Sequence, residues 1–177
     1  MLLRLVGIVK YLYYFFYSKI NPIGYAKHLG VNLGKNVVFY AMKPGMFSTE
    51  PYLITIGDNC YITANCQFIT HDGGVLILRK NVPDLELTYP IKIGNDVYIG
   101  LNTTILPGTT VGNRCIIGAC SVLKGEYPDN SVIAGVPAKV IKTVDEYLEK
   151  AQMNSLHIGH LSAREKDKRI REHYDVK

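Results

Sequence analysis

The sequence predicts an all-β solenoid, a parallel β-helix built from hexapeptides with helical segments at both ends. The main observation is a six-residue period between residues 93 and 123. A period of six fits neither an amphipathic helix nor an alternating strand, and it is typical of a β-helix with one short strand and one corner per hexapeptide. The residues that repeat are all aliphatic: Ile93, Ile99, Ile105, Val111, Ile117 and Leu123.

A second observation is the small or β-branched residue four positions after each of these aliphatic anchors. We expect these side chains to share the interior near the corners: Val97, Thr103, Thr109, Cys115 and Ser121. Glycine follows the anchor at positions 94, 100, 112 and 118, where it tolerates the backbone conformation that a turn needs. The same pattern occurs earlier at Phe39, Ile62 and Phe68.

The period is interrupted at residues 40–55 and again at residues 69–92. In a solenoid such insertions leave the stack as surface loops, and surface loops often carry the function. The second interruption begins with Thr70-His71-Asp72-Gly73-Gly74.

We divide the chain into an N-terminal helical segment (1–30), a β-helix domain (31–142) with a loop at 70–90, and a C-terminal helical segment with a tail (143–177). Within these parts the sequence predicts a helix over 1–17 that ends near Asn21-Pro22, a short helix or turn over 23–32, and a last coil over 131–141. A helix that begins at Val144 is expected to cap the open end of the stack, which solenoids need for solubility. Residues 162–177 read as a solvated helix or a frayed tail.

The composition indicates one globular domain with terminal segments. Of the 177 residues, 47% are hydrophobic, which is ample for a core. The four cysteines have spacings that match no zinc or redox motif, so we predict structural thiols in a reducing cytoplasm: Cys60, Cys66, Cys115 and Cys120.

Positive charge gathers at the N-terminus. Six basic residues precede the first acidic residue, Glu50, so residues 1–49 carry a net charge of +6. The rest of the chain carries −1, which gives the total of +5. They are Arg4, Lys10, Lys19, Lys27, Lys35 and Lys43. The apolar stretch 1–17 is shorter than the roughly 20 residues of a spanning helix and has no small-residue cleavage site.

Two interpretations of this basic, aromatic helix remain open, and they are partly compatible. The helix either packs on the β-helix or on a neighbouring subunit, or it lies in the interface of an anionic membrane. The second interpretation predicts a cytoplasmic protein held peripherally at the inner face of the cell membrane.

His71 is the one histidine of five within the repeat region, and it lies where a coil opens into a loop, beside an acid and two glycines. A general base must be exposed to substrate, held on a rigid scaffold and oriented by a neighbour. The alternative is a loop histidine without a role. His157-x-x-His160 has no evident third ligand, so we expect no metal site.

Two groups of motifs resemble known enzymes. The hexapeptides together with residues 134–141, AGVPAKVI, resemble the left-handed β-helix acyltransferases. Residues 50–53, 70–74 and 129–131 are similar to the bacterial capsule and exopolysaccharide O-acetyltransferases in particular. The resemblance implies a left-handed coil, a homotrimer, and acetyl-CoA bound in the clefts between subunits as the acetyl donor, with no metal. The implied reaction is O-acetylation of a sugar hydroxyl in a surface polysaccharide or its precursor.

The resemblance also implies roles for individual residues. His71 corresponds to the catalytic base, and Glu50 lies close to an acidic residue that holds the acceptor sugar. Asp72 and Arg79 in the loop are further candidates for acceptor contacts, and Arg79 or Lys80 could hold an acidic sugar. Leu101 and Ala119 correspond to cofactor-lining backbone positions with Lys124 near them, and Lys139 and Lys142 to a basic pair that reaches the coenzyme A phosphates.

Leu101 departs from the galactoside enzymes, which have serine there, so a side-chain hydroxyl donor is missing and only the backbone could serve. Other functions remain as alternatives. One is acetylation of a small soluble acceptor such as a xenobiotic or a free saccharide, and another is a non-catalytic structural β-helix. We set aside a metal-dependent β-helix hydratase, because it needs several histidines on the coils and only His71 is present there. We also do not expect nucleic-acid binding, because no nucleic-acid-binding motif accompanies the basic residues.

Overall fold

The structure, a computed structural model, describes residues 2–177 and the side chains from residue 7 onward. One structural unit ends at Val144 and a second one spans Asp145–Lys177. The helices are α1 (Leu2–Ile20), α2 (Pro22–His28), η1 (Pro51–Leu53), η2 (Gly73–Ile77), α3 (Val144–Met153) and α4 (Ala163–Tyr174). The strands are β1 (Asn32–Leu33), β2 (Val38–Phe39), β3 (Ile54–Ile56), β4 (Tyr61–Ile62), β5 (Gln67–Phe68), β6 (Ile91–Ile93), β7 (Tyr98–Ile99), β8 (Thr104–Ile105), β9 (Thr110–Val111), β10 (Ile116–Ile117), β11 (Val122–Leu123), β12 (Glu126–Tyr127), β13 (Ser131–Gly135) and β14 (Ala138–Thr143).

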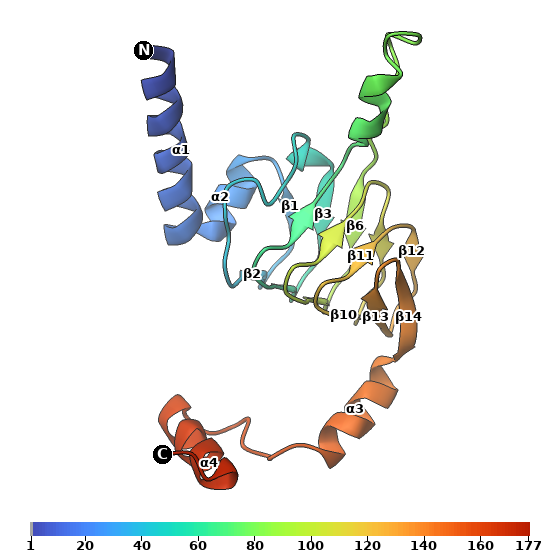
Figure 1. Ribbon diagram of the computed structural model, residues 1–177. Coiled ribbons are helices and arrows are strands. Elements are labelled where there is room, and N and C mark those ends of the chain that lie inside the picture. The colour runs from blue at the N-terminus through green and yellow to red at the C-terminus, as the bar shows by residue number, and fades with distance from the viewer. Residues whose placement is uncertain (1) are drawn as a thin grey trace. The chain divides into compact units, whose positions relative to one another are not determined.

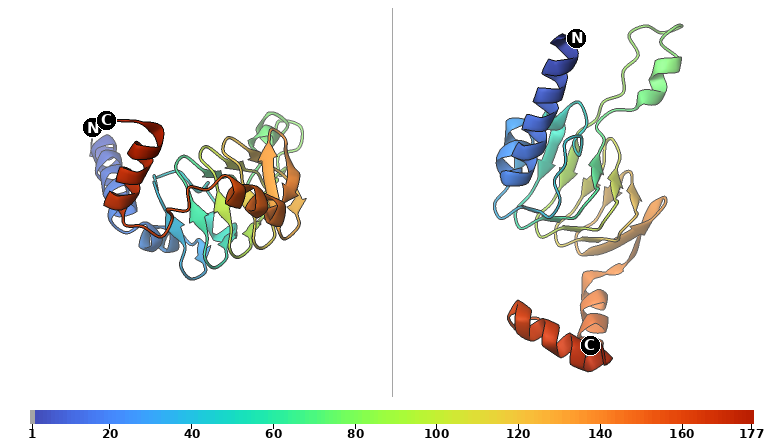
Figure 2. Two further views of the ribbon diagram at one scale, coloured as in Figure 1. Left: turned by 90° about the horizontal axis from the view of Figure 1, so that it is seen from below. Right: turned by 60° about the vertical axis from the view of Figure 1, so that its left-hand side comes forward.

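Short parallel strands form three sheets, and the chain visits them in turn. The sheet orders are β1-β3-β6-β9-β12, β2-β4-β7-β10-β13-β14, and β5-β8-β11. Consecutive strands from β6 to β11 therefore fall in the first, second and third sheet, and then again in the first, second and third. This is the three-sided coil that the period of six predicts, and Figures 1 and 2 show the successive coils stacked on one another.

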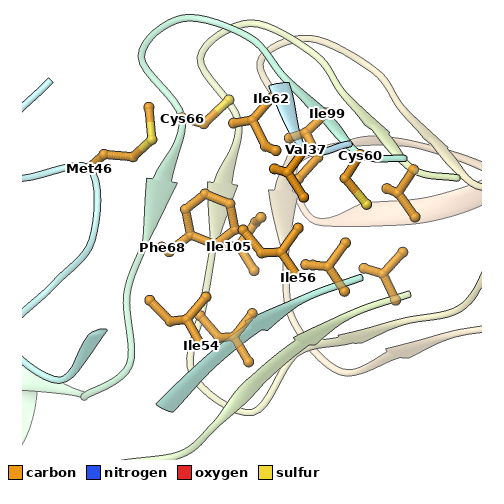
Figure 3. Packing of buried hydrophobic residues seen from close by; sticks show 14 of the residues in the cluster. Val37, Met46, Ile54, Ile56, Cys60, Ile62, Cys66, Phe68, Ile99 and Ile105 are labelled. Atoms are coloured by element: carbon orange, nitrogen blue, oxygen red, sulfur yellow. The ribbon is translucent and has the colours of Figure 1, made fainter. Parts of the chain in front are cut away.

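The anchors fill the interior of the coil. All six aliphatic anchors between residues 93 and 123 are buried, and so are the five residues that follow them by four positions. Parallel pairing places like residues in register, for example Ile62 beside Ile99 and Phe68 beside Ile105. Figure 3 shows these side chains packed together inside the coil. The prediction of a six-residue interior pattern is confirmed.

The corners require close approach of neighbouring backbones. A Cβ atom added at Gly94 would lie 2.6 Å from the backbone of Gly112, and one added at Gly100 would lie 2.5 Å from the Ala119 nitrogen. Neither position can hold a larger residue without moving the next coil. Three of the cysteines, Cys60, Cys66 and Cys115, are buried free thiols as predicted, and burial raises the pKa of each; Cys120 is exposed.

The second interruption leaves the stack as a projecting segment (Figure 1, green). Its base is closed by backbone hydrogen bonds from Asp72 to Leu87 and from Tyr89 to Thr70, each within 2.9 Å. An antiparallel bridge joins His71 to Thr88 between them. This base holds His71 at the rim of the coil while the segment between η2 and residue 86 extends outward.

Helix α1 packs on the coil through one side only. Tyr14 and Tyr17 contact Tyr25 of α2 and join the edge of the hydrophobic core. Phe15 is half-buried. Most other large apolar residues of the described part of α1 are exposed: Ile8, Val9, Tyr11, Leu12, Tyr13, Phe16 and Ile20. The side chain of Arg4 lies outside the described residues. Among the described residues, no helix is both long and apolar enough to cross a membrane.

The predicted last coil over residues 131–141 is wrong in its second half. Strand β13 continues the second sheet in parallel with β10, but β14 folds back antiparallel to β13. The reversal occurs at Gly135, whose φ of +105° favours glycine, and at Pro137, which cannot donate a backbone hydrogen bond. The segment therefore ends the stack as a hairpin.

The second unit contains two helices. Helix α3 follows the predicted pattern from Val144, and the tail forms α4, which begins with a capping box between Ser162 and Glu165. The tail is thus a helix, one of the two predicted alternatives. The capping role expected of α3 stays a prediction.

Replacing a buried anchor should destabilise the coil far more than replacing its outward neighbour. Ile93 of β6 is 3% exposed, while Lys92 beside it is exposed. We expect Ile93→Ala to lower the free energy of unfolding by about 2–5 kcal/mol, and Lys92→Ala to change it by less than about 0.5 kcal/mol. Urea unfolding followed by circular dichroism measures both, and equal losses would contradict the assigned register.

Candidate active site

The spacing of the early coils decides which residues meet His71. Phe39 pairs with Ile62, which is 23 residues later, whereas Ile93 pairs with Val111, which is 18 residues later. The longer coil includes the first interruption, and it places Phe47 beside Phe68. Residues 48–50 therefore lie next to residues 70–71.

Hydroxyl groups and a carboxylate form a continuous hydrogen-bond chain at this point. Thr70 Oγ1 donates to Glu50 Oε2 at 2.7 Å, and Thr49 Oγ1 donates to Glu50 Oε1 at 2.5 Å. Ser48 Oγ lies 2.5 Å from Thr70 Oγ1. Because the Thr70 hydrogen is committed to Glu50, Ser48 is the donor in that pair.

His71 completes the chain. Its Nδ1 atom lies 3.0 Å from Glu50 Oε2 and 3.1 Å from Thr49 Oγ1. Hydrogen bonds from Thr49, from Thr70 and then from His71 lower the pKa of Glu50 to about 2. Glu50 is therefore a carboxylate at neutral pH and can only accept hydrogen bonds.

This pattern fixes the tautomer of the neutral imidazole. Glu50 has no hydrogen to give, and the single hydrogen of Thr49 is directed at Glu50. The proton between Glu50 and His71 must therefore reside on Nδ1 of His71. The Nε2 atom is then unprotonated and can accept a proton, and the His71 side chain is 34% exposed.

Two cavities adjoin His71, and the same three residues, His71, Asp72 and Gly73, line both. The larger cavity, of about 720 Å³, has mostly apolar walls with one cation, Lys124. The smaller one, of about 220 Å³, contains Thr49, Glu50, Arg79 and Glu86. A reactant in either cavity can reach the imidazole, which suits a reaction between two substrates.

The predicted site residues fall into two groups. Glu50, Asp72 and Arg79 line the smaller cavity with His71, and Lys124 lines the larger one. Leu101, Ala119, Lys139 and Lys142 line neither. Leu101 and Ala119 meet at one corner, where the Cys120 nitrogen donates to the Leu101 carbonyl at 2.7 Å. Lys139 and Lys142 lie on β14, paired with Ala134 and Val132 of β13.

The sequence does not single out the residues that hold Glu50, which are Thr49 and Thr70, with Ser48 donating to Thr70. The contact of Glu50 with His71 is visible only in the structure. The pairing of Phe47 with Phe68 has a spacing of 21 residues, which relates position 71 to position 50, and the six-residue period does not report this spacing. Among the described residues, no group of three or more histidine, cysteine or acidic side chains could hold a metal ion.

The chain is similar to several known proteins. A family model described as bacterial transferase hexapeptide (six repeats) matches residues 90–125. Protein CapG of Staphylococcus aureus is 44% identical over 140 residues, which are 79% of this chain and 81% of CapG. The putative lipopolysaccharide biosynthesis O-acetyl transferase WbbJ of Escherichia coli K12 is 39% identical over 97 residues, half of each chain.

Among solved structures, a galactoside acetyltransferase in complex with coenzyme A matches with a TM-score of 0.56 and 29% identity, covering 71% of each chain. With the extent of the similarity to CapG, these findings show that the chain belongs to the hexapeptide-repeat acetyltransferase family and is an acetyl-CoA-dependent acetyltransferase.

Proposed function

We propose that the protein transfers an acetyl group from acetyl-CoA to a sugar hydroxyl of a surface polysaccharide or its precursor, with His71 as the general base. The observation that carries the proposal is the Glu50–His71 contact at 3.0 Å, which leaves Nε2 of the neutral His71 unprotonated on a side chain that is 34% exposed. The name of WbbJ, a putative lipopolysaccharide biosynthesis enzyme, supports the acceptor class.

In the proposed reaction Nε2 takes the proton of the acceptor hydroxyl as its oxygen attacks the thioester carbonyl carbon. The new C–O bond gives a tetrahedral oxyanion, and backbone N–H groups stabilise its charge. The C–S bond then breaks, and the imidazolium returns the proton to the departing thiolate of coenzyme A. Glu50 stabilises the transient positive charge on the imidazole, as the carboxylate of a catalytic triad does.

The two cavities suggest how the substrates divide. The larger cavity has the apolar side chains Ile69, Leu87 and Leu106, which suit the acyl-pantetheine arm, and Lys124 offers a cation beside it. The smaller cavity is lined largely by polar groups, which suit a hydroxyl-rich acceptor. A small soluble acceptor is the alternative function, because a free saccharide would use the same polar groups.

Further proposals concern the assembly. The family relationship supports a left-handed sense for the coil and a homotrimer with donor sites between subunits. The boundaries 1–30, 31–142 and 143–177 remain our proposed division of the chain into an N-terminal helical segment, a catalytic β-helix domain and a C-terminal helical segment. The exposed aromatic residues of α1, with Lys10 and Lys19 each 5.8 Å from an aromatic ring, support peripheral binding to an anionic membrane at its cytoplasmic face.

Removing the imidazole should abolish most of the turnover. We expect His71→Ala to lower kcat roughly 10²–10⁴-fold, the usual contribution of a positioned base. The affinity for coenzyme A should change little, because the larger cavity keeps its other walls. Steady-state kinetics and calorimetric titration with coenzyme A test this, and near-normal turnover in a folded variant would refute the role of His71.

Replacing Glu50 separates its two candidate roles. Glu50→Gln retains the shape but loses the charge, and an amide cannot accept from Thr49, Thr70 and His71 together. We expect kcat to fall about 10²-fold or more through loss of the tautomer and the charge, with the acceptor KM within about threefold. A large rise in acceptor KM at unchanged kcat would show instead that Glu50 holds the sugar.

Removal of the β14 lysines should weaken donor binding. Lys139→Ala and Lys142→Ala are each expected to raise the KM for acetyl-CoA several-fold, more at low salt, because salt screens exposed charges. The acceptor KM should stay within about a factor of three, as separate sites act independently. The control is Lys35→Ala, at an exposed lysine of the first coil, which should leave both KM values unchanged. A rise in the acceptor KM of the Lys139 or Lys142 variant instead would show that these lysines serve the acceptor and not the donor.

Membrane binding should depend on the exposed side of α1. In co-sedimentation with anionic phosphatidylglycerol vesicles, we expect the intact protein to bind and to dissociate as salt rises. The double variant Val9→Ser/Phe16→Ser should bind at least about fivefold more weakly, since it removes interfacial apolar area. Tyr40→Ser, at an exposed aromatic residue outside α1, is the control. Equal sedimentation of all three would mean that α1 does not contact lipid.

A further inference from the structure

The smaller cavity beside His71 has an excess of negative charge. The lining residues include three carboxylates, Glu50, Asp72 and Glu86, and one cation, Arg79. With His71 neutral, their formal charges sum to −2. The remaining lining residues are uncharged: Thr49, Gly73, Val75 and Leu76.

Among the described residues, Arg79 is the one cation that lines this cavity, and it is paired within the loop. The guanidinium of Arg79 donates through Nη2 to Glu86 Oε2 and through Nε to the Leu85 carbonyl at 2.9 Å. A guanidinium paired with a carboxylate presents little net charge to a third group. Arg79 is therefore a poor partner for an acidic substrate.

The carboxylates are held in defined positions. Glu86 accepts a second hydrogen bond from Thr88 Oγ1 at 2.9 Å, and Thr88 is bridged to His71 at the base of the loop. Asp72 Oδ1 accepts from the Gly74 nitrogen at 2.9 Å. Each carboxylate also has lone pairs beyond these contacts, which can accept hydrogen bonds from hydroxyl or ammonium groups.

We propose that this cavity selects uncharged or amino-bearing sugars and discriminates against sugar acids, with Glu86 as the residue that sets the preference by neutralising Arg79. The inference rests on the proposed function, because it assigns the acceptor to this cavity. It differs from the sequence-based hypothesis that Arg79 or Lys80 holds an acidic sugar.

The test compares acceptors that differ in charge alone. Methyl galacturonide and methyl glucuronide are each paired with the corresponding uronamide, which has the same shape without the charge, and the parent methyl hexosides are included. We expect kcat/KM to be roughly ten-fold lower for the uronate than for the uronamide. The reason is repulsion of the uronate carboxylate by the two carboxylates that Arg79 does not neutralise, Glu50 and Asp72. If transfer requires the hydroxyl at C6, inhibition constants against the parent hexoside give the same ratio.

Two variants locate the effect. Glu86→Gln releases the guanidinium of Arg79 and should move the uronate-to-uronamide ratio about ten-fold toward the uronate. Asp84→Asn removes a carboxylate of the same loop that lines neither cavity beside His71, and it should leave the ratio within about twofold. Ratios, unlike absolute rates, do not depend on the fraction of folded enzyme.

The outcomes distinguish the proposed charge selection from the proposed acetylation of a saccharide. Transfer to the uronate as fast as to the uronamide, or equal shifts in the two variants, would overturn the charge selection and leave the acetyltransferase proposal standing. No transfer to any of these sugars by an enzyme that binds acetyl-CoA would contradict the proposed saccharide acceptor itself, and the charge selection with it.

Discussion

The site depends on the register of stacked parallel coils. Backbone hydrogen bonds between coils pair each residue with one a coil length away, so the length of a coil determines which side chains become neighbours. The pairing of Phe47 with Phe68, which lie 21 residues apart, places the segment of Ser48 and Glu50 against that of Thr70 and His71. Insertion or deletion of one residue in this coil would turn the side chain of Glu50 toward the opposite face of its strand and separate it from His71.

The interior stacking makes this register rigid. Buried anchors on each side of the site, such as Phe47, Phe68 and Ile105, pack in contact across three coils. Thr70 is fully buried beside them and still donates its hydroxyl to Glu50. The carboxylate thus receives a hydrogen bond from a rigid part of the coil, while the side chain of His71 is 34% exposed beside two cavities.

The sequence could predict the coil, because a six-residue period is a local pattern that directly reports the interior positions. It also singles out His71 as a candidate base, because this is the only histidine in the repeat region, and its role stays a proposal. It did not predict that Glu50 binds His71, because that contact depends on the lengths of two interrupted coils. The Arg79–Glu86 pair and the return of β14 along β13 depend on the paths of a loop and a hairpin, which the period does not describe.

The central claim is that Glu50 fixes neutral His71 with its proton on Nδ1 and leaves Nε2 free to act as the base. Long-range ¹H–¹⁵N correlation spectra of the imidazole rings test it directly, with the His71 signals identified by their loss in His71→Ala. The account predicts a protonated Nδ1 and an unprotonated Nε2 in the neutral ring. A neutral His71 with its proton on Nε2 would contradict it, because that nitrogen could not accept the proton of an acceptor hydroxyl.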